Sequence, residues 1–277
     1  MTAQSLPQSL PRTVKSRLWA DAPAFTGLAL FITLTALPLI GAAMIDTRTF
    51  LDAPVWQKPL QFHLALATYV LTLAFFARFL PQGMTSRRWR IYAAVVSFCV
   101  LAELVWVGSA ASYATASHFN VDDPVMGAIY GLMGVFAVIL TSASLVMGVA
   151  IWRNPATGLA PALHLSVALG LILTFVLTLI AAGTLSSMLG HHIGTPVTNA
   201  ALPILGWSRE VGDLRVGHFF ATHALHVLPI VGLIASRAFS ADVARGTVLA
   251  AALAYVALVL LTMLQAFQGQ PFLPWLG

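Results

Sequence analysis

The sequence predicts an all-α, polytopic membrane protein with seven transmembrane helices in one membrane domain over residues 1–277. Of these residues, 59% are hydrophobic and 8% are charged, whereas a soluble domain carries about 25% charged residues. The apolar residues also form seven separate runs, each near or above the roughly 20 residues that cross a bilayer as a helix. The predicted spans are Ala24–Ile45, Leu60–Leu80, Ile91–Ala111, Val125–Trp152, Ala162–Met188, Val216–Phe239 and Thr247–Phe267.

The loops between these runs predict the orientation. Basic residues are enriched in the cytoplasmic loops of membrane proteins. With a cytoplasmic N-terminal segment (residues 1–23), ten basic residues face inward and four face outward, and the C-terminus lies outside. The net charge of +5 therefore reflects topology, and we expect no nucleic-acid partner. The inner group is Arg12, Lys15, Arg17, Arg78, Arg87, Arg88, Arg90, Arg153, Arg237 and Arg245, and the outer group is Arg48, Lys58, Arg209 and Arg215.

The longest outer loop, residues 189–215, contains GHHIGTP and GWSREVGDLR. Loops longer than about 12–15 residues are usually functional or disordered. Its Pro and Gly residues favour an ordered cap over the outer end of the bundle. Cys99 is the only cysteine, so an intramolecular disulfide and a CxxCH haem attachment are both excluded.

Ionisable residues inside the predicted spans mark a candidate site, because such residues are costly in a bilayer and usually functional. The sixth run carries His218, His223 and His226, and the third carries Glu103. Glu103 and His223 lie at a similar depth, about 15 Å below the outer ends of their helices. Four further histidines lie in or near the outer loops: His63, His118, His191 and His192.

Helical geometry limits which histidines can act together. His223 and His226 are at i and i+3 and are neighbours on the helix surface. His218 and His226 are about 12 Å apart along the axis, too far to bind one metal ion. The sixth span therefore offers an upper ligand, His218, and a lower one, His223, which His226 can assist.

Several motifs resemble those of an uncharacterised family of bacterial multi-spanning membrane proteins. The matching pieces are Lys58-Pro59-Leu60-Gln61-Phe62, Glu103, Ser117-His118-Phe119-Asn120, Met133-Gly134, Gly190-His191, and Gly212-Asp213-Leu214-Arg215 followed by His218-Phe219 and His223-Ala224-Leu225. The resemblance covers most of the chain and implies a bacterial inner membrane protein, but it brings no activity.

This chain departs from the family pattern at three positions. Gln61 stands where Lys is typical, His226 where Gln is typical, and His63 where an apolar residue is typical. These departures weaken His63 and His226 as core ligands. The candidate core ligands that match the family pattern are Glu103, His118, His191 or His192, His218 and His223. All are reachable from the periplasmic side.

The first hypothesis is a transition-metal site for Zn, Fe or Cu, because neutral imidazoles and a carboxylate suit these ions. Such a site would serve a copper or iron redox enzyme, or a metal hydrolase that acts on a lipid substrate. Glu103, Asp213 and Arg215 are the predicted catalytic residues. The predicted metal ligands are His118, His191, His192, His218, His223 and Glu103.

Two alternatives stay open. A b-type haem for membrane electron transfer with a quinone needs one or two axial histidines, and the candidates are His63, His218, His223 and His226. A proton- or cation-linked transporter or sensor needs no cofactor, because histidines titrate near neutral pH. No predicted span contains a lysine, which argues against a retinal Schiff base. The lipid bilayer is the one partner that the sequence clearly indicates. The sequence is also compatible with an oligomer.

Overall fold

The computed structural model describes residues 14–51, 53–198, 200–202 and 205–276. Within these residues, seven helices are long and apolar enough to cross a membrane, as the sequence predicted, and the chain is a multi-pass membrane protein. Arg12 and the rest of residues 1–13, from the predicted N-terminal segment, lie outside the described residues. So do residues 199 and 203–204 of the predicted cap. The seven helices are α2 (Pro23–Ile45), α3 (Gln57–Phe76, continued by the 3-10 turn η1, Ala77–Phe79), α4 (Arg87–Ser112), α5 (Pro124–Trp152), α6 (Pro161–Ser187), α7 (Leu214–Ala238) and α8 (Ala241–Phe267).

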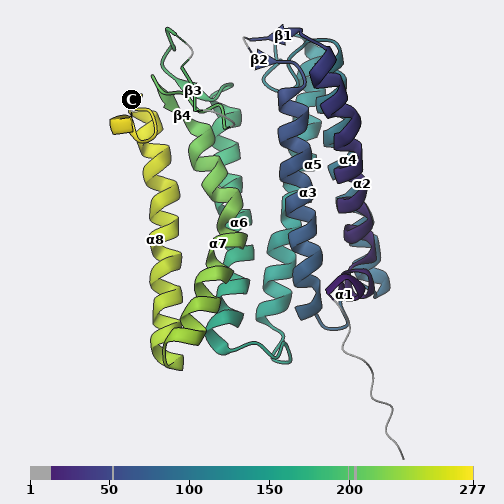
Figure 1. Cartoon of the computed structure of the whole chain (residues 1–277), viewed down its shortest axis with the longest axis vertical. Helices are drawn as coiled ribbons and strands as arrows, with labels where there is room; N and C mark the ends of the chain where they lie inside the picture. Colours follow the sequence, from purple (N-terminus) through teal and green to yellow (C-terminus); the bar gives the residue numbers. More distant parts are fainter. Residues whose placement is uncertain (1–13, 52, 199, 203–204, 277) are drawn as a thin grey trace, which may run out of the picture.

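Short elements outside the spans were not predicted. The strands β1 (Thr49–Phe50) and β2 (Ala53–Pro54) form one antiparallel pair, and β3 (His192–Ile193) and β4 (Gly212–Asp213) form another. Figure 1 shows both pairs at one end of the bundle, together with the C-terminal turn η2 (Pro274–Leu276); we name this the cap end. The short helix α1 (Val14–Asp21) lies at the opposite end, where the arginines gather; we name this the basic end.

Several helices begin at a capping side chain that precedes the first apolar residue. The Ser86 hydroxyl accepts from the backbone N–H of Trp89 at the start of α4. The Asp123 carboxylate accepts from two backbone N–H groups at the start of α5. Such caps satisfy backbone donors that the first turn leaves free. These two helices therefore start slightly before the predicted apolar runs. Helix α8 also starts early, at Ala241 where the run was expected to begin at Thr247, but it has no side-chain cap.

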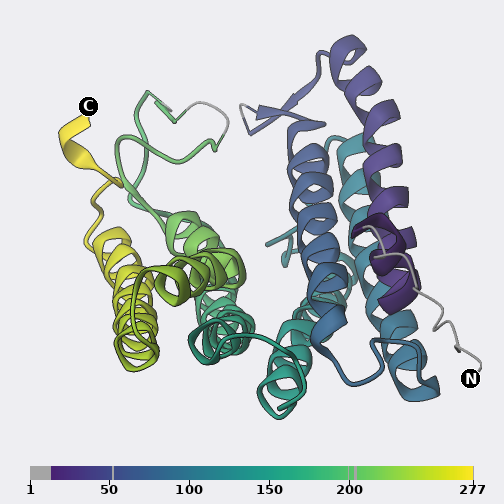
Figure 2. The same ribbon diagram turned by 60° about the horizontal axis from the view of Figure 1, so that its bottom comes forward.

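The helices form two groups, α2–α5 and α6–α8, which Figure 2 shows on opposite sides of the bundle. The groups meet where α5 packs closely on α6. A Cβ atom added at Gly148 would lie 2.9 Å from side-chain atoms of Leu171 and Ile172, so only glycine permits this approach. A second connection is the hydrogen bond between the Thr72 hydroxyl of α3 and His226 Nε2 of α7, at 3.0 Å.

The described part of the long loop folds over α7 and α8 at the cap end. The half-buried Glu210 carboxylate accepts hydrogen bonds from the backbone N–H groups of Val197, Thr198 and Ala200 at 2.7–3.1 Å. Trp207 is 5% exposed and packs against three phenylalanine rings, of which two belong to α7 and one to the C-terminal segment. The cap is thus held by its own carboxylate and by one buried indole.

Candidate functional site

Ionisable side chains from both helix groups meet at the cap end. Lys58 comes from the first turn of α3, Glu103 from α4, His118 from the loop between α4 and α5, and Arg215 and His218 from α7. Lys58 lies within electrostatic range of Glu103 and Arg215, and His118 lies within range of Lys58 and His218. These five residues are named the cap-end cluster below.

The contact between Lys58 and His118 defines which ring nitrogen of His118 carries the proton. Lys58 Nζ lies 3.2 Å from His118 Nδ1. An ammonium group has only donors, so His118 Nδ1 accepts and carries no proton. We therefore assign His118 as the neutral tautomer with its proton on Nε2.

The loop that carries His118 is fixed by its neighbours. The indole N–H of Trp106 donates to the Ser117 carbonyl at 2.7 Å, and the Ser117 hydroxyl lies 3.0 Å from His118 Nδ1. The imidazole also packs between the rings of Phe62 and Tyr130, with centroids 5.7 and 5.8 Å away. His118 therefore has one orientation set by α3, α4 and α5 together.

Glu103 is a buried carboxylate with an unused oxygen. The residue is 4% exposed, and its Oε2 has no hydrogen-bond partner in the described part of the chain. Buried carboxylate oxygens normally have a partner. A proton or a hydrogen-bond donor from outside the chain would complete this group. The same is true of His218 Nδ1, which is also buried and has no hydrogen-bond partner among the described residues.

The Asp213–Arg215 pair belongs to the start of α7. The Asp213 side chain is fully buried and accepts from Arg215 Nη2 at 2.6 Å and from the backbone N–H of Ser208 at 3.0 Å. It also accepts from the Arg215 backbone N–H and so caps α7. Arg215 Nη2 donates in addition to the Gly206 carbonyl at 2.6 Å. These contacts indicate that the pair holds the cap on the helix.

The two loop histidines lie beside this pair. His192 pairs with Asp213 across the β3–β4 ladder, and its Nε2 is 3.7 Å from Asp213 Oδ2. His191 and His192 have ring centroids 4.2 Å apart. Burial opposes ionisation of Asp213, but the nearby His192 and the hydrogen bonds from Arg215 outweigh it and hold the pKa of this carboxyl well below its usual range.

Deeper in the bundle, His223 and His226 form a hydrogen-bonded chain with α3. The Thr72 hydroxyl donates to the Thr68 carbonyl at 2.7 Å, so it must accept from His226 Nε2. His226 Nδ1 is then unprotonated and accepts from His223 Nδ1 at 3.0 Å. The adjacency expected from the i, i+3 spacing is present, and both nitrogens of His226 are in use.

The lowered pKa values of two histidines outside the spans predict that the cap end loosens in acid. Burial, with Lys58 and His218 nearby, lowers the pKa of His118 from 6.5 to about 3. Burial and Arg215 lower the pKa of His191 to about 4. A histidine with a lowered folded-state pKa contributes stability above its unfolded pKa and loses it as the pH falls toward the folded value. We expect hydrogen exchange of residues 189–215, corrected for intrinsic rates, to rise between about pH 6.5 and 4.

The matched control for this pH dependence is a histidine at the other end. His118→Gln and His191→Gln should flatten the rise. His164→Gln should not, because His164 donates to the Ile151 carbonyl at the basic end. An equally steep rise in the His118 and His191 variants would contradict the assignment.

The predicted metal ligands are only partly brought together. Among the described residues, no group of three or more His, Cys, Asp or Glu side chains is placed to hold a metal ion. Zinc sites use three or four protein ligands. Glu103 Oε2 and His218 Nδ1 are buried ligand atoms without partners in the described part of the chain, but the Lys58 ammonium near Glu103 adds positive charge. The cluster as built therefore fits a metal ion poorly.

The predicted haem ligands differ in which of their ring nitrogens are already hydrogen-bonded. His63 is 7% exposed, and its Nδ1 lies 2.8 Å from the Pro59 carbonyl one turn earlier, so an axial bond to iron would have to use Nε2. His226 has no nitrogen left for an axial bond. His63, His218 and His223 therefore stay predicted haem ligands.

Two residues of the site were missed in the sequence. Lys58 was placed in a loop because the apolar run begins at Leu60, and the expectation that no span contains a lysine was wrong. Pro59 was an available signal, since proline favours the first turn of a helix. Thr72 gave no signal, because its role depends on which helix lies opposite.

Comparison of the chain with protein-family models, curated proteins and solved structures finds no match.

Proposed function

We propose that this chain is a protein of the bacterial inner membrane whose cap end faces the periplasm and whose cap-end cluster takes up and releases protons, in proton- or cation-linked transport or sensing. The observation that carries the proposal is Glu103, a 4% exposed carboxylate with an unpartnered oxygen near the Lys58 ammonium. Ionisable groups inside membrane spans commonly form proton relays. The orientation is supported by the arginines of the basic end, which cytoplasmic loops favour.

The cluster offers two charge states that differ by one proton. An ionised Glu103 is balanced by Lys58. A protonated Glu103 leaves the Lys58 ammonium with His118 Nδ1 as its one described hydrogen-bond partner. Loss or gain of this proton therefore changes the force on Lys58, and through Lys58 on the loop that carries His118.

The chain of His223, His226 and Thr72 supports a path for protons toward the middle of the bundle. A neutral imidazole can receive a proton on one nitrogen and release one from the other. The order of donors runs from His223 Nδ1 to His226 Nδ1, and from His226 Nε2 to the Thr72 hydroxyl. This chain joins α7 of one helix group to α3 of the other.

Transition-metal binding is the second candidate, because the unpartnered Glu103 Oε2 and His218 Nδ1 atoms are both metal-ligand types. It would need further ligands, since no described group of three or more such residues is placed to hold an ion. Enzymatic activity on a quinone or a lipid belongs to this candidate. The catalytic role predicted for Asp213 and Arg215 stays a prediction, and their contacts support a positioning role.

The test is a pH titration of the protein in liposomes by infrared difference spectroscopy. The C=O stretch of a protonated buried carboxyl group should appear in the wild type and disappear in Glu103→Gln. Glu210→Gln is the control, because Glu210 is a loop carboxylate whose partners are backbone N–H groups of the cap. It should leave this band in place.

An unchanged carboxyl band in Glu103→Gln would overturn the proposal. Elemental analysis of the same samples separates the two candidates. Stoichiometric Zn, Fe or Cu that is present in the wild type and lost in Glu103→Gln would replace proton exchange by metal binding.

A further inference from the structure

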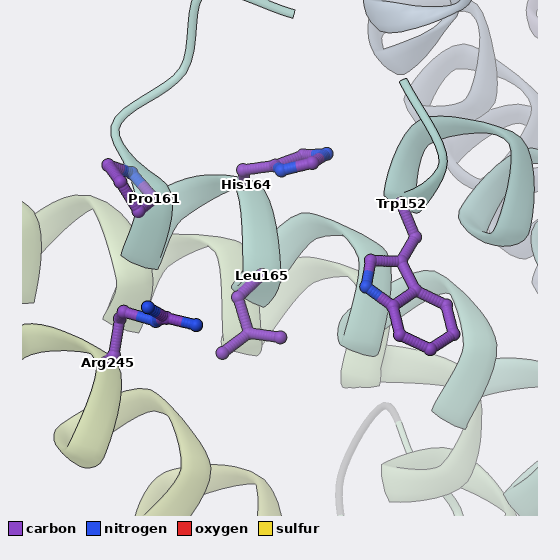
Figure 3. A pocket seen from close by; sticks show the side chains of 5 residues that line it. All are labelled: Trp152, Pro161, His164, Leu165 and Arg245. Carbon is purple, nitrogen blue, oxygen red and sulfur yellow. The ribbon is translucent and has the colours of Figure 1, made fainter. Parts of the chain in front are cut away.

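We propose that a pocket at the basic end binds the head-group phosphate of an anionic phospholipid. This inference is independent of the cap-end cluster, because the pocket lies at the opposite end of the bundle. It is formed where α5 ends, α6 begins and α8 begins, and Figure 3 shows its five lining side chains. They are Trp152, Pro161, His164, Leu165 and Arg245.

The pocket has one cationic and one aromatic wall. Figure 3 shows the Arg245 guanidinium on one side, directed toward Leu165, and the Trp152 indole on the other. Trp152 is 60% exposed at the last turn of α5. Tryptophan concentrates at the level of lipid head groups, where its ring is half in water and half in the apolar region. The pocket therefore lies at head-group depth.

The pocket wall is held by internal contacts. His164 Nε2 donates to the Ile151 carbonyl at 2.7 Å and ties α6 to the end of α5. Leu165 packs on a small buried cluster that joins α6, α7 and α8. The pocket is therefore present before any ligand arrives.

The charge at this end suits an anion. Eight described arginines lie at the basic end, against the two carboxylates Asp21 and Asp242. No described carboxylate forms an ion pair with Arg245, which is exposed. Basic pockets between transmembrane helices on the cytoplasmic side bind anionic head groups. The eight arginines are Arg17, Arg78, Arg87, Arg88, Arg90, Arg153, Arg237 and Arg245.

Size and surroundings favour a lipid over a free anion. The pocket volume of about 230 Å³ is below the roughly 300–1,000 Å³ of sites that enclose a complete ligand. It therefore holds part of a molecule. Arg245, Leu249 and Leu253 follow one another at i, i+4 and i+8 on one face of α8. The two leucines are 49% and 72% exposed, and they offer an apolar surface for an acyl chain that starts beside the guanidinium.

The test is native mass spectrometry of the purified full-length chain with added phosphatidylglycerol or zwitterionic phosphatidylethanolamine. Wild type should retain phosphatidylglycerol in preference. Arg245→Gln should lower its retention about fivefold, the effect of one basic side chain near a membrane surface, and leave phosphatidylethanolamine unchanged. Arg88→Gln is the control, because Arg88 is exposed at the same end and does not line the pocket.

Three outcomes would overturn the proposal. Arg245→Gln could retain phosphatidylglycerol as wild type does. Arg88→Gln could lower phosphatidylglycerol retention as much as Arg245→Gln does, which would indicate a diffuse charge effect. Soluble glycerol phosphate could displace the lipid completely, which would indicate a site for a water-soluble phosphate.

Discussion

Replacement of Asp213 by asparagine is expected to lower the free energy of unfolding by about 3 kcal/mol, the lower end of the cost of breaking a buried ion pair. The lower end applies because the Arg215 side chain is 34% exposed while Asp213 is fully buried. Asparagine keeps the shape but removes the charge that Arg215 faces. The measurement is unfolding in mixed micelles with increasing denaturing detergent, followed by circular dichroism.

Asp122→Asn is the matched control, because Asp122 is exposed in the loop before α5 and makes no described hydrogen bond. It should change stability by less than about 0.5 kcal/mol. The double variant Asp213→Asn/Arg215→Gln should be less destabilised than the sum of its single variants, since both remove the same pair. Additive effects, or equal losses in Asp213→Asn and Asp122→Asn, would show that the pair does not hold the cap.

Replacement of Gly232 by alanine should destabilise the α6–α7 interface by about 1–3 kcal/mol, the range for overpacking a close-packed core. An added Cβ at Gly232 would overlap the side chain of Ser166, which is fully buried. Ser166 cannot turn away freely, because its hydroxyl donates to the Leu163 carbonyl at 2.8 Å. The same detergent titration measures the effect.

The control for this interface is Gly183→Ala in α6. Gly183 is exposed and has no atom within 4 Å of an added Cβ. Its replacement should be neutral or stabilising by about 0.5–1 kcal/mol, because alanine is the better helix former. Ser166→Gly in the Gly232→Ala background should restore part of the lost stability. Equal effects at Gly232 and Gly183 would contradict the close contact.

The spans could be predicted from sequence because each depends on a single segment. Apolar length fixes where a helix crosses the bilayer, and all seven runs correspond to helices. The helix starts were displaced because several first turns contain polar residues, which hydropathy leaves out of the apolar runs. Lys58 was missed for this reason, since α3 begins at Gln57 and the apolar run at Leu60. The short strand pairs of the loops gave no hydropathy signal.

The candidate site was predicted in its chemistry and only partly in its geometry. Glu103 and the α7 histidines were singled out because ionisable groups are rare in membrane spans. The contact between His223 and His226 followed from the pitch of one helix. The partners on other helices, such as Thr72 for His226, did not follow from any spacing in the chain.

By itself the sequence determined the number of spans, the gathering of arginines at one end and the polar residues within the helices, because hydropathy and helical pitch act within one segment. Only the tertiary structure decided which of those residues meet. Close packing at Gly148 and Gly232 sets how the helices approach one another. Within the α2–α5 group, α3 lies beside the loop between α4 and α5, so that Lys58 contacts His118 while Glu103 Oε2 has no described partner. Contacts between helices depend on the shapes of both surfaces, and no single segment carries that information.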